Sequence, residues 1–206
     1  MIDVCRKTPP FVLASGSPRR EQLLKALGWD FIKDVPDIDE RLYPGEKAEG
    51  AVIRLALEKA SVVAQRHHEC LVVAADTIVR LGQAVLGKPA NRLEAFEILG
   101  MLGGKTHEVL TGVAIVQGER KASGYERTLV EFRDLTRDAI DAYLDCNESL
   151  DKAGAYGIQE RGSLLVKSIH GCYFNVVGLP LGLMSRLLED IGVPLEHQWR
   201  MGYERP

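Results

Sequence analysis

Cys70-Leu-Val-Val-Ala-Ala-Asp76-Thr77-Ile-Val79 is the stretch of this 206-residue chain that decides its fold class. Its run of apolar, largely β-branched residues predicts a buried strand over residues 70–75, with the carboxylate of Asp76 at its end. An ionised Asp in such surroundings costs several kcal/mol unless it is paired or bound to a metal. Asp76 is therefore a candidate metal ligand or general base, with a helix cap or a structural ion pair as the alternative.

A second informative stretch lies near the start of the chain. Phe11-Val-Leu-Ala14 predicts a short strand, Ser15-Gly-Ser17 a turn with Ser17 as N-cap, and Pro18-Arg-Arg20 the first turn of a helix. Free N–H groups and the helix dipole attract an anion there, and a guanidinium group can donate two parallel hydrogen bonds to a phosphate. Two solvated Arg side chains are the alternative, but cations oppose the dipole at this end of a helix. We expect an anion site, with a polyphosphate as the anion.

Helix and strand patterns alternate along the rest of the chain, and several neighbouring strands read as hairpins, with turns at Gly82-Gln83 and Gly118-Glu119. Leu23, Leu24 and Leu27 form the apolar stripe of the first helix, and Asn91 and Thr136 are expected to cap two later helices. We expect helices over residues 18–27, 48–66, 91–102, 136–144 and 180–191, and strands over residues 11–14, 70–75, 84–86, 106–116, 120–132, 164–169 and 173–177. This order favours an α/β fold with a mixed, partly antiparallel sheet flanked by helices. One domain over residues 10–193 is expected, followed by an irregular tail over residues 194–206.

The composition is that of an ordinary globular chain, with 46% hydrophobic and 27% charged residues and a formal net charge of −3. This charge gives no general attraction to nucleic acid or to an anionic membrane. Cys5, Cys70, Cys146 and Cys172 form no C-x-x-C pair and are predicted to be reduced thiols. No leader pattern starts the chain and no apolar run approaches the ~20 residues of a membrane span, so we expect a cytoplasmic location.

Two lysines stand at positions that suit phosphate binding. Lys59 falls on the apolar stripe of its predicted helix, where a snorkelling stem is the alternative to a functional ammonium. Lys88 stands between Gly87 and Pro89, and a Lys in a rigid loop is a good point charge for a phosphate.

Two further segments supply candidate ligand groups. Glu40, next to Asp39 in an acidic loop over residues 34–47, could join Asp76 at a Mg²⁺ site, which typically takes one or two carboxylates and substrate phosphates. Loop acids are, however, more often solvated. Asp151–Gln159 is rich in glycine, which allows close backbone approach to a ligand, and the amide of Gln159 suits the edge of a nucleobase. A turn-rich connection is the alternative for this segment.

These motifs together resemble the Maf family. The resemblance covers roughly residues 10–193 and rests on six motifs in order: Ser15-Gly-Ser-Pro-Arg-Arg20, Asp39-Glu-Arg41, Glu58-Lys-Ala60, Ala75-Asp-Thr77, Gly87-Lys-Pro89 and Asp151–Gln159. It implies a nucleoside triphosphate pyrophosphatase with a fold related to that of inosine triphosphatases. The last motif resembles the branch that hydrolyses dTTP and UTP. One departure is Ala75, where the family often has Gly; the added methyl group is not expected to abolish activity.

The resemblance also implies roles for individual residues. Asp76 would be the general base, and Glu40 and Asp76 would hold Mg²⁺ or Mn²⁺. Arg19, Thr77 and Gln159 are associated with base choice in this branch. The residues expected to bind the small-molecule nucleoside triphosphate are Ser15, Ser17, Arg19, Arg20, Lys59, Thr77, Lys88 and Gln159. The oligomeric state stays open, with a homodimer as one arrangement.

Two alternatives remain at this point. The substrate could be a modified pyrimidine nucleotide or 7-methyl-GTP, which a sister branch hydrolyses. The chain could instead act chiefly as a binding partner in the arrest of cell division, which the family resemblance also suggests, with hydrolysis secondary.

Overall fold

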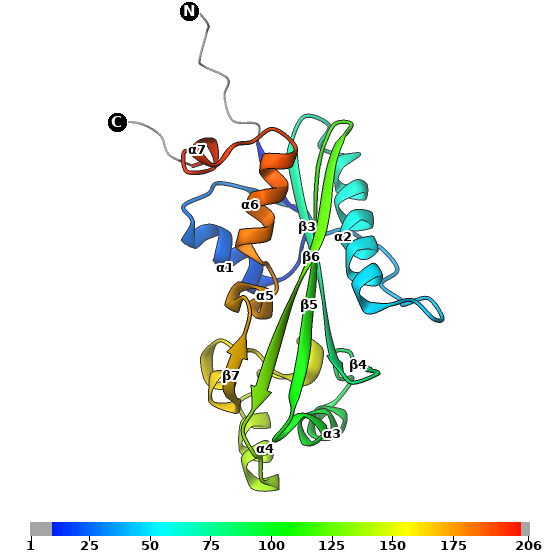
Figure 1. Ribbon diagram of the computed structural model, residues 1–206, viewed down its shortest axis with the longest axis vertical. Coiled ribbons are helices and arrows are strands. Elements are labelled where there is room, and N and C mark those ends of the chain that lie inside the picture. Colours follow the sequence, from blue (N-terminus) through cyan, green and yellow to red (C-terminus); the bar gives the residue numbers. More distant parts are fainter. Residues whose placement is uncertain (1–9, 203–206) are drawn as a thin grey trace, which may run out of the picture.

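The computed structural model describes residues 10–202 and consists of one seven-stranded sheet covered by helices (Figure 1). Cys5 lies outside these residues, as does the N-terminal stretch in which no leader pattern was expected. The strands are β1 (Phe11–Leu13), β2 (Ile32–Lys33), β3 (Leu71–Leu81), β4 (Ala84–Leu86), β5 (Thr106–Gln117), β6 (Arg120–Phe132) and β7 (Val166–His170). The helices are α1 (Pro18–Ala26), α2 (Ala48–Ala64), α3 (Arg92–Leu102), α4 (Arg137–Leu144), α5 (Tyr173–Val177), α6 (Leu181–Asp190) and α7 (Leu195–Gln198), with 3₁₀ turns η1 (Ala153–Ala155) and η2 (Glu160–Leu165).

The sheet is mixed, as predicted. Its order is β2-β1-β3-β5-β6-β7, and β4 pairs with β3 on the side where β1 also pairs. β1 runs parallel to β2 and β3, whereas the other pairs are antiparallel. The long strands β3, β5 and β6 form the axis of the molecule, with α2 on one side and α1, α5 and α6 on the other (Figure 1). α3 and α4 cover the end near β4 and β7.

Helix α2 approaches the sheet unusually closely, and this fixes the position of the side chains on its inner face. Its buried Ala56, Ala60 and Val63 pack on small residues of β3 and β5. At Gly112 of β5, an added Cβ would lie 2.1 Å from the carbonyl oxygen of Val52. A glycine is therefore required where the helix backbone meets the strand.

Strand β3 is longer than predicted. It continues to Leu81, so Asp76 lies in the middle of the strand and not at its end. The extension is stabilised by pairing on both edges, because Thr77–Arg80 pair with β5 and Val79–Leu81 pair with β4. The predicted hairpin around Gly82-Gln83 is confirmed, and it is this hairpin that holds the second half of the strand.

The strand predicted over residues 173–177 is wrong, because this segment forms helix α5. Its aromatic and β-branched residues favour a strand, but the chain leaves the sheet at Gly171, which has φ +131°. The hydroxyl of Thr128 then accepts a hydrogen bond from the Cys172 N–H and donates one to the Cys172 carbonyl. Gly178, with φ +112°, ends the helix after one turn.

Two smaller expectations also differ from the structure. The tail predicted to be irregular contains helix α7, which the buried Gln198 ties to Ser185 and Val193 by side-chain hydrogen bonds. Leu27, predicted on the inner face of α1, is 43% exposed. None of the helices of residues 10–202 has the length and apolar character that crossing a membrane requires.

Candidate active site

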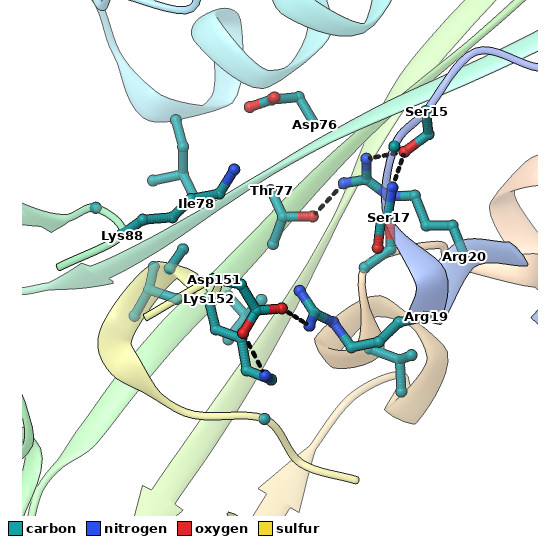
Figure 2. A pocket seen from close by; sticks show the side chains of 18 of the residues that line it. Ser15, Ser17, Arg19, Arg20, Asp76, Thr77, Ile78, Lys88, Asp151 and Lys152 are labelled. Carbon is teal, nitrogen blue, oxygen red and sulfur yellow. Dashed lines mark hydrogen bonds and ion pairs between the residues drawn. The ribbon is translucent and has the colours of Figure 1, made fainter. Parts of the chain in front are cut away.

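A pocket of about 630 Å³ opens where β3 lacks a neighbouring strand (Figure 2). β1 pairs with β3 only as far as Val73, and β4 begins to pair at Val79. Among the strands of residues 10–202, this leaves residues 74–78 of β3 without a partner on that edge. The pocket fills this gap, so the middle of β3, where Asp76 lies, forms its floor.

All ten residues predicted for the site line this one pocket: Ser15, Ser17, Arg19, Arg20, Glu40, Lys59, Asp76, Thr77, Lys88 and Gln159. The lining contains five basic side chains against three carboxylates. A chain with a net charge of −3 thus concentrates positive charge in its pocket, which suits an anionic ligand.

Lys59 joins the two carboxylates that were predicted as metal ligands. Its ammonium lies 2.5 Å from Asp76 Oδ1 and 2.7 Å from Glu40 Oε1. The side chain of Lys59 is 8% exposed, so the snorkelling alternative is wrong: the ammonium ends inside the protein between two acids. Asp39, the neighbour of Glu40, instead pairs with Arg41.

The charges around Glu40 oppose the effect that burial has on its pKa. Burial alone would raise the pKa of Glu40, but the hydrogen bond from Lys59 and the charges of Lys59, Lys88 and Arg20 outweigh this and hold the pKa below its ordinary value. Glu40 is therefore a carboxylate at neutral pH. Lys88 itself is exposed and lines the pocket opposite the Ser15–Arg20 segment (Figure 2).

Arg20 is fixed in the pocket by neutral oxygen atoms. Its guanidinium donates to Gly178 O at 2.7 Å, Ser15 Oγ at 3.0 Å and Thr77 Oγ1 at 3.1 Å. Burial lowers the pKa of Arg20, and the charge of Asp76 opposes this effect. An arginine remains charged in proteins, so a desolvated cation is aimed into the pocket without a carboxylate in contact.

The Ser15-Gly-Ser17 turn orders the start of α1 differently from the prediction. The Ser17 side chain makes no capping bond; instead its N–H donates to Ser15 Oγ at 3.2 Å. Ser15 thereby contacts both the turn and Arg20. Pro18 opens the helix as predicted.

Asp76 and Thr77 point to opposite faces of β3 (Figure 2). Asp76 faces α2 and its Lys59. Thr77 faces Arg20, and its hydroxyl also hydrogen-bonds Thr111 Oγ1 at 3.0 Å. The two neighbouring residues of the motif therefore serve different parts of the pocket.

Asp151 and Lys152 line the pocket, although the sequence did not single them out as individual site residues. Asp151 accepts from Arg19 at 2.8 Å and from Lys152 at 2.5 Å. Burial would raise the pKa of Asp151, but hydrogen bonds from Lys152 and Arg19 hold it below its ordinary value. Two adjacent opposite charges before a glycine-rich run were the only local signal, because the pairing with Arg19 joins residues far apart in sequence.

The glycine-rich segment that follows is anchored by a buried pair. Tyr156, which lines the pocket, hydrogen-bonds through its hydroxyl to His107 Nε2 at 2.8 Å. Burial lowers the pKa of His107 to about 4, so this histidine is neutral at pH 7. The contact holds the segment that carries the half-buried Gln159 against β5.

The carboxylates of the pocket do not form a preassembled metal shell. No group of three or more His, Cys, Asp or Glu side chains that could hold a metal ion occurs in the described part of the chain. Glu40 and Asp76 nevertheless converge on one cation, the Lys59 ammonium. Two carboxylates are a sufficient protein donor set for Mg²⁺ when substrate phosphates and water complete it.

Together, the fold and the pocket define an α/β protein with a cation-rich cleft that surrounds two converging carboxylates, a class suited to phosphorylated small molecules. The chain belongs to the Maf-like protein family, whose model matches residues 10–191. The resemblance deduced from the six motifs is thereby confirmed.

Relatives cover nearly the whole chain. It is 47% identical over 184 residues to a protein of Symbiobacterium thermophilum named dTTP/UTP pyrophosphatase, covering 89% of this chain and 95% of the relative. A protein of Bacillus anthracis with the same name is 46% identical over 186 residues, covering 90% of this chain and 97% of the relative. Among solved structures, a HAM1 protein from Coxiella burnetii matches with a TM-score of 0.45 and 18% identity, over 61% of this chain and 73% of the other.

Proposed function

We propose that this chain hydrolyses dTTP and UTP to the nucleoside monophosphate and pyrophosphate. The observation that carries the proposal is the Glu40–Lys59–Asp76 cluster, placed on the floor of a cation-rich pocket in a chain of this family. The relatives' name supplies the substrates, and nearly full coverage of both chains supports the transfer. Such an enzyme would remove these nucleotides, or modified pyrimidine nucleotides, from the cellular pool.

Three cations are placed to bind the triphosphate. Arg20 is preorganised by its three oxygen partners, Lys88 is an exposed side chain of the pocket lining, and Lys59 lines the pocket between Glu40 and Asp76. A triphosphate gains negative charge on its leaving group as the α–β linkage breaks. Fixed cations in a partly desolvated pocket stabilise that charge without reorganising.

Asp76 is proposed as the general base. It is held by Lys59 in one orientation, and its carboxylate is only 13% exposed. In this position it can take a proton from a water molecule that attacks the triphosphate near the α–β linkage. Lys59 would then keep the protonated or ionised acid in place throughout the reaction.

We also propose that Glu40 and Asp76 hold a divalent cation, Mg²⁺ or Mn²⁺. The convergence of both carboxylates on a single ammonium supports this, since the same two acids can share a metal cation. When bound, such a cation supplies Lewis-acid polarisation of phosphate oxygens. The remaining ligands would come from the substrate and water.

Base choice is proposed for Arg19, Thr77 and Gln159. Arg19 lies on the other side of Thr77 from Asp76 (Figure 2), and Gln159 lines the same pocket, so the nucleobase would lie at this end. The Thr77 hydroxyl already contacts Arg20 and Thr111, so its contribution would be to position Arg20. The cytoplasmic location and the homodimer stay predictions.

The test is pyrophosphate release from dTTP, UTP, CTP, GTP and 7-methyl-GTP with Mg²⁺ or Mn²⁺, and again with a chelator. We expect metal-dependent turnover that is highest with dTTP and UTP. Turnover of 7-methyl-GTP alone would keep the chemistry and contradict the branch. No turnover with any nucleotide would favour the alternative of a division-regulating binding protein, and a cell-division phenotype unchanged by Asp76→Asn would support that alternative further.

A further inference from the structure

One carboxylate joins the two walls of the pocket at the end away from Glu40 and Asp76. Asp151, on the segment between α4 and η1, contacts Arg19 of α1 at 2.8 Å and its own neighbour Lys152 at 2.5 Å (Figure 2). Arg19 and Asp151 are 132 positions apart in sequence. This bridge brings two cationic side chains to the same place in the pocket.

The course of the Lys152 side chain is set by packing as well as by charge. The side chain is only 15% exposed. Its stem crosses Gly157, where an added Cβ would lie 2.9 Å from Lys152 Cε. A larger residue at position 157 would displace the lysine, so the glycine keeps the ammonium inside the pocket.

Burial differs sharply across this cluster. The side chains of Arg19 and Lys152 are 23% and 15% exposed, whereas that of Asp151 is 57% exposed. The two cations are thus mostly covered and oriented by the acid. Without Asp151, their like charges would repel and each long side chain would regain its rotamer freedom.

The hydrogen-bonding polarity of these groups can distinguish pyrimidines. Uracil and thymine carry a carbonyl at C4 and an N–H at N3, whereas cytosine carries an amino group at C4 and an acceptor at N3. Gln159 offers both a donor and an acceptor and can rotate its amide to match either base. Guanidinium and ammonium groups only donate, so they can donate to the 4-carbonyl of uracil or thymine but leave the 4-amino group of cytosine without an acceptor.

We propose that Asp151 is a positioning residue that holds Arg19 and Lys152 as paired donors for the 4-carbonyl of uracil and thymine, and so selects UTP and dTTP against CTP. This inference rests on the proposed function and deepens it. Lys152 becomes a specificity residue in contact with the base. Asp151 acts through Lys152 and Arg19, which it orients.

The experiment compares kcat/KM for UTP and CTP in the wild type, Asp151→Asn, Asp151→Glu and Lys152→Met. Arg19 and Lys152 contact different oxygens of Asp151, and Asn replaces one of these oxygens with an NH2 donor, so one of the two cations loses its acceptor. Loss of one charge-assisted hydrogen bond predicts that the UTP:CTP ratio falls roughly 10- to 100-fold in Asp151→Asn and Lys152→Met. Asp151→Glu should keep more of the wild-type UTP:CTP ratio than Asp151→Asn does. In Asp151→Asn and Lys152→Met, kcat/KM for CTP should equal or exceed the wild-type value.

A merely structural role for Asp151 would give a different pattern, because a loosened pocket lowers kcat/KM for both nucleotides and leaves their ratio unchanged. The matched control is Glu131→Gln, which removes a carboxylate that accepts from Lys167 at 2.7 Å and from Ser168 at 2.8 Å outside the pocket. We expect it to leave the ratio at the wild-type value.

Equilibrium binding separates failure of this inference from failure of the proposed function. The probes are the α,β-methylene analogues of UTP and CTP, which resist cleavage at the reacting bond. A wild type that hydrolyses UTP, with the same UTP:CTP ratio in all three variants, overturns the inference and leaves the function standing. If the wild type hydrolyses nothing, a binding preference for the UTP analogue that is lost in Asp151→Asn still supports the inference, and equal binding of both analogues overturns it.

Discussion

Asp76→Asn tests the proposed chemistry most directly, because the structure allows the loss of turnover to be separated from a loss of folding. Asn keeps the shape of Asp and leaves an oxygen for Lys59, whose ammonium also keeps Glu40 at 2.7 Å. Removing one partner of a buried ion pair costs about 3–5 kcal/mol when the other charge is stranded. In Asp76→Asn the Lys59 charge keeps Glu40 as its partner, so we expect the free energy of unfolding to fall by only about 1–2 kcal/mol.

For a chain of 206 residues, that cost corresponds to a fall in Tm of roughly 2–8 °C. Loss of a general base should lower turnover by roughly 10²- to 10⁴-fold. The assays are pyrophosphate release at saturating UTP and Mg²⁺, and thermal unfolding by circular dichroism. Asp141→Asn, which weakens an exposed ion pair with Arg92, is the control and should keep full turnover. Turnover of Asp76→Asn within tenfold of the wild type, at a comparable Tm, would refute the assignment of the base.

Three further results are expected. His107 is neutral when folded, with its pKa lowered from the ordinary 6.5 to about 4, so the unfolded chain binds its proton first as the pH falls. The wild type should therefore lose about 2–3 kcal/mol more stability than His107→Gln between pH 7 and pH 4.5 in urea unfolding; parallel losses would contradict the buried neutral histidine. Gly112→Ala should cost about 1–3 kcal/mol, because its Cβ would meet the backbone of Val52 at 2.1 Å. Gly100→Ala, in open space on α3, should instead add about 0.5–1 kcal/mol, and equal effects of the two substitutions would refute the close approach of α2. Lys59→Met removes the ammonium that the two pocket carboxylates share, so Mn²⁺ should bind more tightly by calorimetry while turnover falls; weaker Mn²⁺ binding would contradict a metal site at those carboxylates.

Local features of this fold were predictable from the sequence because a few neighbouring residues decide them. Asn91 caps α3 by accepting from the Glu94 N–H, and Thr136 caps α4 by accepting from the Ala139 N–H, as the patterns predict. The turns at Gly82 and Gly118 both have positive φ angles, which glycine adopts without strain. Each of these features is complete within about four residues.

Features that depend on distant partners were predicted less well. The second half of β3 exists because β4 and β5 pair with it, and α5 exists because Thr128 of β6 captures the backbone of Cys172. Propensity over residues 173–177 favours a strand, yet contacts with the sheet decide for a helix. Tertiary context outweighs a local preference of this size.

The sequence by itself determined which side chains the site contains, since residue types in six ordered motifs identified the family and all ten predicted residues line one pocket. Only the tertiary structure decided how those side chains pair. Lys59 binds Glu40 and Asp76, Arg20 binds neutral oxygens, and Asp151 bridges Arg19 and Lys152. The physical reason is that a hydrogen bond or ion pair requires a separation of about 3 Å, and for residues far apart in the chain only the folded sheet and its helices set that distance.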